Sequence, residues 1–305
     1  MKLIFAGTPA NAARSLRTLA AKHDVALVIT REDAPIGRKR EVTPSPVAQV
    51  AAELGLTTLK RNRLSAEDAG LISKLEASVA VVVAYGALIP KSLLEILPWW
   101  NLHFSTLPNW RGATPLQHSM LWGGEGAGIT LFELEAGLDT GPILALRPMK
   151  IDFDKTCGEL LDEFTDLGSD MILKALDERP TPNAQSGEAS LAPKISREQA
   201  RLDLSLSADQ LAWKVMALNP EPMAWCELEG NPIRILRASS LGATNWNSLD
   251  GHAPTPGLVR LSENRVLVEC GNGTRLELKE LQPAGKKVMA ALDWYRGLNR
   301  EIELD

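Results

Sequence analysis

Three polar side chains alternate along one short stretch of the sequence, at Asn101, His103 and Ser105. In an extended strand, alternate side chains point to the same face, so these three are expected on one side and Leu102 and Phe104 on the other. An imidazole accepts a proton when neutral and donates two hydrogen bonds when charged, and its ordinary pKa lies close to neutral pH. The alternation therefore favours His103 over the other three histidines as a functional group.

The chemistry that suits these residue types is attack of a nucleophile on a carbonyl. Donors at Asn101 and His103 would stabilise the oxyanion, and Asp139, in the turn Leu138-Asp139-Thr140-Gly141-Pro142, would orient the imidazole and help to remove a proton from an attacking amine. The Asp-Thr-Gly sequence also occurs in aspartic proteases, but their chemistry needs two carboxylates that share a proton, and the chain has one such motif. An Asp139 that only caps its own turn is the structural alternative. Ser105 lacks the G-x-S-x-G elbow of a hydrolase nucleophile and is interpreted as a loop residue that holds a ligand.

The elements that position these residues are predicted to form an α/β fold with a Rossmann-like parallel sheet. The chain opens with a strand at 2–6, a helix at 10–22 and a strand at 25–30, which is a βαβ unit. The most apolar strand, 79–84, is expected at the centre of the sheet, and the Asn101 stretch follows it. In such sheets, ligands bind beyond the carboxyl ends of the strands. Only Gly7 of a G-x-G-x-x-G fingerprint is present, so a nicotinamide dinucleotide is not expected.

The composition is that of a globular protein with two domains. The 305 residues exceed one average domain, and apolar residues make up 45% and charged residues 23%. A net charge of −5 argues against non-specific polyanion binding by the whole molecule but leaves room for a local basic face. Three widely spaced cysteines without a CxxC pair indicate neither a zinc site nor a disulfide framework. No signal peptide or membrane-spanning run is evident, so we expect a cytoplasmic location and no membrane contact.

The second half of the chain differs from the first in composition and in the pattern of its predicted strands. Residues 180–193 have the composition of a linker, and several short strands with turns between them follow, which is typical of a small OB-like β-barrel. We therefore predict a catalytic domain at 1–184, a linker at 185–205 and a C-terminal β-barrel domain at 206–305.

A basic segment lies near the start of the chain. Between residues 31 and 63 there are seven basic and four acidic residues, with Arg38-Lys39-Arg40 in a polar loop at 31–46. A solvated charged loop and a flexible arm that contacts phosphates both fit this pattern.

Several motifs together resemble the 10-formyltetrahydrofolate-dependent formyltransferase family, and within it the methionyl-tRNA formyltransferases, over nearly the whole length. The motifs that carry the resemblance are Phe5-Ala6-Gly7-Thr8-Pro9, Gly37-Arg38-Lys39-Arg40, Ala84-Tyr85-Gly86, Asn101-Leu102-His103, Ser105-Thr106-Leu107-Pro108, Trp110-Arg111-Gly112, Leu138-Asp139-Thr140-Gly141, Asn219-Pro220 and Leu281-Gln282-Pro283-Ala284-Gly285-Lys286-Lys287.

The resemblance implies transfer of a formyl group from 10-formyltetrahydrofolate, as co-substrate, to the amino group of initiator methionyl-tRNA, without a metal. A monomer is the default expectation. The catalytic residues it implies are Asn101, His103 and Asp139. The folate-binding residues it implies are Tyr85, Gly86, Ser105, Thr106, Leu107 and Pro108. The tRNA-binding residues it implies are Arg38, Lys39, Arg40, Lys286 and Lys287.

Other functions remain open at this point. A sibling transferase would act on glycinamide ribonucleotide or an amino sugar nucleotide, a hydrolase would use water in place of the amine, and an RNA-binding protein would perform no catalysis. The sequence departs from the family pattern at Phe104, where a glycine is usual, at Thr106, where a leucine is usual, and at Asn11, where an aromatic residue is usual. Residues 206–305 carry eleven basic and thirteen acidic residues, so binding of tRNA there requires a cationic stripe.

Overall fold

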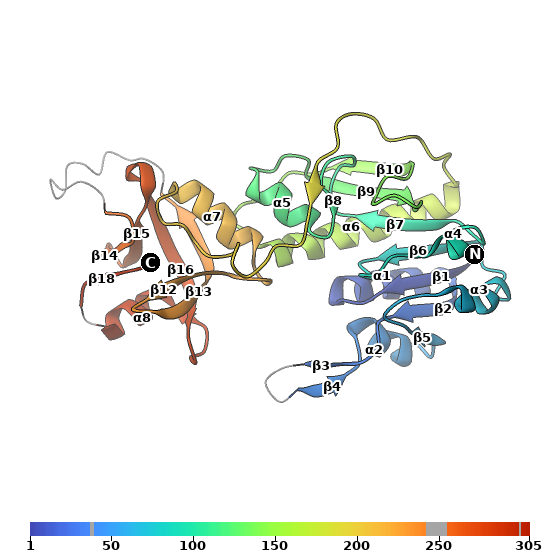
Figure 1. Cartoon of the computed structure of the whole chain (residues 1–305), viewed down its shortest axis with the longest axis horizontal. Helices are drawn as coiled ribbons and strands as arrows, with labels where there is room; N and C mark the ends of the chain where they lie inside the picture. Colours follow the sequence, from blue (N-terminus) through green and yellow to red (C-terminus); the bar gives the residue numbers. More distant parts are fainter. Residues whose placement is uncertain (37–39, 242–254, 299) are drawn as a thin grey trace. The chain divides into compact units, whose positions relative to one another are not determined.

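The computed structural model describes residues 1–36, 40–241, 255–298 and 300–305 (Figure 1). The chain forms two compact units. The first unit comprises Met1–Pro115, Gly126–Lys150 and Leu161–Pro193, and the second comprises Leu116–Glu125, Ile151–Leu160 and Lys194–Asp305. Among the described residues, no helix combines the length and the apolar character that a membrane crossing requires.

A seven-stranded sheet forms the centre of the first unit, in the order β10-β9-β7-β6-β1-β2-β5. Its strands are β1 (Lys2–Gly7), β2 (Asp24–Thr30), β5 (Thr58–Lys60), β6 (Val79–Val83), β7 (Trp99–His103), β9 (Gly128–Glu133) and β10 (Ile143–Pro148). The pairs from β5 to β7 are parallel, whereas β9 is antiparallel to both β7 and β10. This arrangement confirms the predicted Rossmann-like α/β fold.

Local sequence explains where the helices of the first unit begin and how the sheet is buried. The helices are α1 (Ala10–Ala20), α2 (Pro46–Glu53), α3 (Ala66–Ser73), α4 (Lys91–Leu94) and most of α6 (Cys157–Glu178). Ser65 caps α3, and the Asp68 side chain accepts from the Ser65 backbone in return. Every residue of β6 is buried, as expected for a central strand covered on both faces.

The basic segment predicted as a loop contains a short hairpin. Strands β3 (Ala34–Ile36) and β4 (Glu41–Thr43) pair in antiparallel fashion. Arg40 is exposed, and Arg38 and Lys39 lie outside the described residues. Alternation of apolar and polar residues over three positions is too short a signal to distinguish such a strand from a loop.

Two short strands bring the end of the first unit back to the segment that follows β7. Strand β8 (Arg111–Gly112) pairs in parallel with β11 (Leu191–Ala192), which lies in the stretch with linker composition. The chain there is hydrogen-bonded into the first unit, since the Ala192 carbonyl accepts from the backbone N–H of Ala113 at 2.9 Å.

The second unit is built on an antiparallel sheet, in the order β12-β13-β16-β15-β14-β18, with β17 paired to β16. Its strands are β12 (Ala224–Leu228), β13 (Asn231–Ser240), β14 (Leu258–Ser262), β15 (Arg265–Glu269), β16 (Arg275–Pro283), β17 (Met289–Ala290) and β18 (Ile302–Glu303). The unit also holds α5 (Pro115–Leu121) apart from its first residue, α7 (Ala208–Ala217) and α8 (Ala291–Leu298). The curled antiparallel sheet confirms a second, β-rich domain of barrel type.

We expect Gly112→Ala to destabilise the first unit by about 1–3 kcal/mol, because overpacking a tight contact costs free energy on this scale. Gly112 has a φ of 131°, and a Cβ atom there would lie 2.6 Å from the Ala192 carbonyl oxygen. Urea unfolding of the variant measures the loss.

Gly70→Ala is the matched control for Gly112→Ala. Gly70 lies in α3, and a Cβ atom added there would have open space around it to 4 Å, so alanine is expected to raise stability by about 0.5–1 kcal/mol. Equal unfolding midpoints for the two variants would contradict the tight contact at Gly112.

Candidate active site

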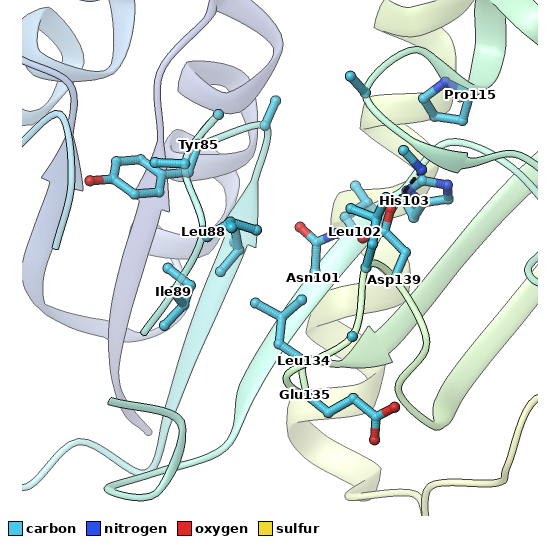
Figure 2. Close-up of a pocket in the computed structure, with 18 of the residues that line it drawn as sticks. Tyr85, Leu88, Ile89, Asn101, Leu102, His103, Pro115, Leu134, Glu135 and Asp139 are labelled. Carbon is cyan, nitrogen blue, oxygen red and sulfur yellow. Dashed lines mark hydrogen bonds and ion pairs between the residues drawn. The ribbon is translucent and has the colours of Figure 1, made fainter. Parts of the chain in front are cut away.

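A cavity of about 520 Å³ opens at the carboxyl ends of β6 and β7, and the segment that follows β9 also lines it (Figure 2). Its lining comes from four segments: Val82 with Ala84–Ile89 and Leu94, Asn101–Phe104, Gly112–Ala113 with Pro115, and Leu134–Asp139. The volume falls in the range of small-molecule pockets, and its walls are mostly apolar with a few convergent polar groups. This is the carboxyl end of the parallel strands, where ligands bind in open α/β sheets.

His103 is the last residue of β7 and is only 4% exposed. Its Nε2 lies 2.9 Å from the carbonyl oxygen of Trp110, and its Nδ1 lies 3.8 Å from Oδ2 of Asp139. A carbonyl oxygen only accepts, so Nε2 carries the hydrogen. A neutral His103 therefore presents a lone pair at Nδ1, on the side of Asp139.

The protonation of His103 is set by two opposing effects. Burial lowers the pKa of His103 below the ordinary value of 6.5, while the charge of Asp139 and the hydrogen bond to the Trp110 carbonyl oppose this shift. Because the net shift is downward, the imidazole is neutral at neutral pH. It can then accept a proton at Nδ1, and the resulting cation would lie beside the Asp139 carboxylate.

Asp139 lies in the connection between β9 and β10, and its backbone adopts a left-handed conformation with a φ of 49°. Its Oδ2 accepts a hydrogen bond of 2.8 Å from the backbone N–H of Gly112. Such a conformation is uncommon outside glycine, and aspartate tolerates it better than most residues. The turn therefore aims the carboxylate back at the end of β7.

Asn101 lies two residues before His103 on β7 and is partly exposed. It pairs with Val82 of β6 on one side and Phe132 of β9 on the other, so its backbone is fixed in the middle of the sheet. Figure 2 shows the Asn101 carboxamide in the cavity, near the His103–Asp139 pair. The structure thus brings together the three residues that the alternation and the turn predicted.

The opposite wall of the cavity follows β6. Tyr85 and Gly86 line it, as do Leu88 and Ile89 (Figure 2). The Tyr85 hydroxyl donates to the Arg61 carbonyl at 2.7 Å, which leaves its ring as part of the wall, and burial raises the pKa of Tyr85. Leu88 is 82% exposed. These residues offer an apolar surface to a planar ligand.

The predicted ligand-binding run from Ser105 to Pro108 does not line this cavity. Ser105 is fully buried, and its hydroxyl donates to the Asn109 carbonyl at 2.5 Å. Thr130 ties the run to β9, because its hydroxyl donates to the Ser105 carbonyl and accepts from the Leu107 N–H. The run shapes the turn between β7 and Trp110, and its contact with a ligand stays a prediction.

Phe104 was expected to point away from the cavity, yet it is among the lining residues. The expectation relied on strand alternation, and β7 ends at His103. Leu102, which lies within β7 and was expected on the same side as Phe104, also lines the cavity, so strand alternation alone does not decide which residues reach it. We have no account of why a phenylalanine occupies this position.

The sequence did not predict two side chains outside the cavity that hydrogen-bond to the backbone of Trp110 and Asp139. The Trp110 N–H donates to Ser190 Oγ at 2.9 Å, and Gln185 Nε2 donates to the Asp139 carbonyl at 2.8 Å. Both partners lie in the stretch with linker composition, where nothing in the sequence marks a polar residue as structural.

The predicted tRNA-binding residues are exposed where they are described. Arg40 in the first unit and Lys286 and Lys287 in the second are all exposed. Among the residues that the structure describes, no group of three or more His, Cys, Asp or Glu side chains is arranged to hold a metal ion.

With this geometry in place, comparison with known proteins gives a decisive match. Residues 1–176 match the family described as "Formyl transferase", and residues 194–299 match "Formyl transferase, C-terminal domain". This chain belongs to the formyl transferase family. A methionyl-tRNA formyltransferase of Leifsonia xyli subsp. xyli is 45% identical over 312 positions, with all of both chains covered. One of Acidothermus cellulolyticus is 42% identical, with 97% of each chain covered.

Solved structures of formyl transferases share the fold. A methionyl-tRNA formyltransferase from Clostridium thermocellum superposes with a TM-score of 0.59 and 20% identity, over 78% of this chain and 93% of that one. An N-formyltransferase from Helicobacter canadensis, in complex with folinic acid and dTDP-3-aminofucose, gives a TM-score of 0.66 and 15% identity, over 93% of this chain and 99% of that one. At these identities the likeness concerns the fold alone.

The lowered pKa of His103 predicts the acid side of the pH profile. After correction for the protonated fraction of the attacking amine, which titrates separately, kcat/KM should be constant above pH 6.5. Below pH 6.5 it should fall, as the imidazole gains a proton. In Asp139→Asn the fall should begin at lower pH, because the carboxylate raises the pKa of His103. Initial rates measured from about pH 4.5 to 8 test this.

His23→Gln is the control for this profile. Burial also lowers the pKa of His23, but its Nδ1 contacts the N-terminal amine and it does not line the cavity. An acid limb that disappears in His23→Gln, or that moves to higher pH in Asp139→Asn, would contradict the assignment to His103.

Proposed function

We propose that this protein transfers the formyl group of 10-formyltetrahydrofolate to the amino group of initiator methionyl-tRNA, in the start of protein synthesis. The observation that carries the proposal is the convergence of Asn101, His103 and Asp139 on one cavity at the end of the parallel strands. Relatives between 39% and 45% identical over nearly the whole chain are methionyl-tRNA formyltransferases, which favours this acceptor over small amines.

The reaction forms a bond between the methionine nitrogen and the formyl carbon and breaks the bond from that carbon to N10 of the folate. The amine loses a proton and N10 gains one, so charge and atoms balance. Neutral His103 is suited to take the amine proton at Nδ1, where Asp139 at 3.8 Å stabilises the imidazolium. The charged His103 then has an Nδ1–H to donate.

The Asn101 amide supplies a donor for the oxygen that gains negative charge as the amine adds to the carbonyl. Its place in the middle of β7 fixes the donor before the reaction begins, so little reorganisation is needed. One such donor typically contributes about 100- to 1,000-fold to turnover.

The cavity suits the folate co-substrate. Its 520 Å³ accommodates a fused ring system, and the wall formed by Tyr85–Ile89 together with Leu134 and Leu138 offers apolar contact. Donors and acceptors of the backbone between Leu134 and Asp139 border the same space. Ser105–Pro108 remain proposed folate contacts through the turn that they shape.

We further propose a division of labour between the parts of the chain. Residues 1–184 carry the catalytic groups, 185–205 connect, and 206–305 bind tRNA together with the basic segment around Arg40. We propose a monomer in the cytoplasm; the three cysteines are free and buried, which fits a reducing compartment.

The test is to incubate the protein with 10-formyltetrahydrofolate and, in turn, methionyl-tRNA, glycinamide ribonucleotide, an amino sugar nucleotide or water alone. We expect formylation of methionyl-tRNA and a loss of about 100-fold or more in His103→Gln, because the proton acceptor is removed. His118→Gln, a histidine outside the cavity, serves as the matched control. Formylation of a small amine, or hydrolysis alone, would replace the proposed function with that reaction.

Lys286 and Lys287 should contribute to tRNA binding through phosphates. Alanine at both is expected to raise KM for methionyl-tRNA about 10-fold, leave KM for the folate unchanged and flatten the salt dependence of tRNA binding. Lys279→Ala, an exposed lysine on β16 of the same unit, is the control. If the salt dependence of tRNA binding were unchanged in the double variant, neither lysine would belong to the tRNA site.

Arg38→Ala and Lys39→Ala test the basic segment by the same measurement.

A further inference from the structure

After α6 the chain returns to the cavity along residues 183–193. At one end of this segment, Asn183 and Ile143 exchange backbone hydrogen bonds of 2.7 and 2.8 Å. At the other end, β11 pairs with β8, and Ser190 Oγ accepts from the Trp110 N–H. The segment is therefore fixed at one end to β10 and at the other to β8 and Trp110, and all of it belongs to the first unit.

Gln185 lies between these two anchors and is half-buried in an otherwise exposed run. Its Nε2 donates to the carbonyl oxygens of Asp139 and Gly141, each at 2.8 Å. Its Oε1 accepts from the Arg111 guanidinium, at 2.7 Å from Nη2 and 3.2 Å from Nε. Both amide hydrogens and both oxygen lone pairs are thus occupied, and Arg111 fixes which end of the carboxamide faces the turn.

The two carbonyls that Gln185 holds flank the turn that aims the Asp139 side chain. Asp139 has a φ of 49°, a conformation that persists in a non-glycine residue only when its surroundings enforce it. With the turn held, Oδ2 of Asp139 reaches the Gly112 N–H and faces His103 Nδ1. Loss of the two Gln185 hydrogen bonds would leave the turn free to relax and the carboxylate free to move away.

We propose that Gln185 is a positioning residue for the formyl-transfer reaction, which holds the Asp139 turn so that the carboxylate faces His103. This inference rests on the proposed function for its catalytic consequence, but the geometry it describes can be measured without turnover. Arg111 assists by orienting the Gln185 carboxamide. The residue is part of the catalytic architecture although it lies at the start of the predicted linker.

The charged groups around the pair define what its displacement would do. The Asp139 carboxylate faces His103 directly, Glu135 lies on the same cavity, and the Arg111 guanidinium contacts Gln185. Asp139 raises the pKa of His103 against the effect of burial. Movement of this carboxylate away from the ring therefore lowers the pKa of His103 further, which is a signature that a general loss of stability does not produce.

The experiment compares Gln185→Met and Gln185→Glu with wild type, and uses Glu188→Ala as the control. Methionine keeps the length but removes every hydrogen bond, whereas glutamate keeps the acceptor for Arg111 and places an oxygen against the two carbonyls. Glu188 is exposed on the same segment and does not line the cavity. Both Gln185 variants should lower kcat about 10- to 100-fold, with KM for methionyl-tRNA unchanged, because misplacement of a catalytic group by about 1 Å has effects of this size.

Two further measurements distinguish a Gln185 that positions the Asp139 carboxylate from a Gln185 that only stabilises the fold. In the free protein, NMR titration of the imidazole protons, assigned with His103→Gln, should give a lower pKa for His103 in Gln185→Met than in wild type. Gln185→Glu does not enter this comparison, because its added carboxylate would itself raise the pKa of His103. Adding Gln185→Met to Asp139→Asn should cost little more than Asp139→Asn alone, since residues that act as one unit are non-additive.

An unchanged pKa of His103 in Gln185→Met, or losses that multiply in the double variant, would overturn the inference. The NMR result stands apart from catalysis. Absence of formylation by wild-type protein would therefore count against the proposed function, while the titration would still decide the role of Gln185.

Discussion

The Asp139 carboxylate contacts two groups, one at the end of β7 and one in the segment that follows it. Its Oδ2 accepts from the Gly112 N–H at 2.8 Å and faces His103 Nδ1 at 3.8 Å. Gly112 reaches this position because β8 lies against β11, so closely that a Cβ atom would collide with Ala192. A single carboxylate thus requires the end of β7, the turn after β9 and the returning segment to be placed together.

Burial of His103 explains why the contact with Asp139 matters for proton transfer. Removal from water favours the neutral imidazole, and so provides a base at neutral pH. The same burial would make the protonated form costly during the reaction if no opposite charge were present. Asp139 is already oriented before the proton arrives, so its stabilisation of the cation requires little rearrangement. The pKa of His103 therefore depends on its burial and on the position of the Asp139 carboxylate, and a histidine elsewhere on the surface would not have it.

Much of the fold and part of the site follow from local patterns in the sequence. The βαβ opening and the apolar run at 79–84 predict the sheet. The alternation at Asn101 and His103 predicts the edge of the sheet where the cavity lies, because both residues lie within β7 and line that cavity. The same rule fails at Leu102 and Phe104, which were expected on the opposite side and yet line the cavity. The hairpin of β3 and β4 was missed because its strands have three residues each.

Gln185 shows the limit of such reasoning. It is separated from Asp139 by 46 positions, and Ser190 is separated from Trp110 by 80. The groups that they hold at the site, the Asp139 and Gly141 carbonyls and the Trp110 N–H, belong to the backbone and carry no residue identity that a sequence pattern could reveal. A stretch rich in Pro, Ser, Asn and Gln is also what a solvated linker looks like. The sheet is fixed by many redundant apolar contacts, whereas the aim of the Asp139 turn depends on one carboxamide. A substitution that leaves the fold intact can therefore remove the arrangement on which the chemistry depends.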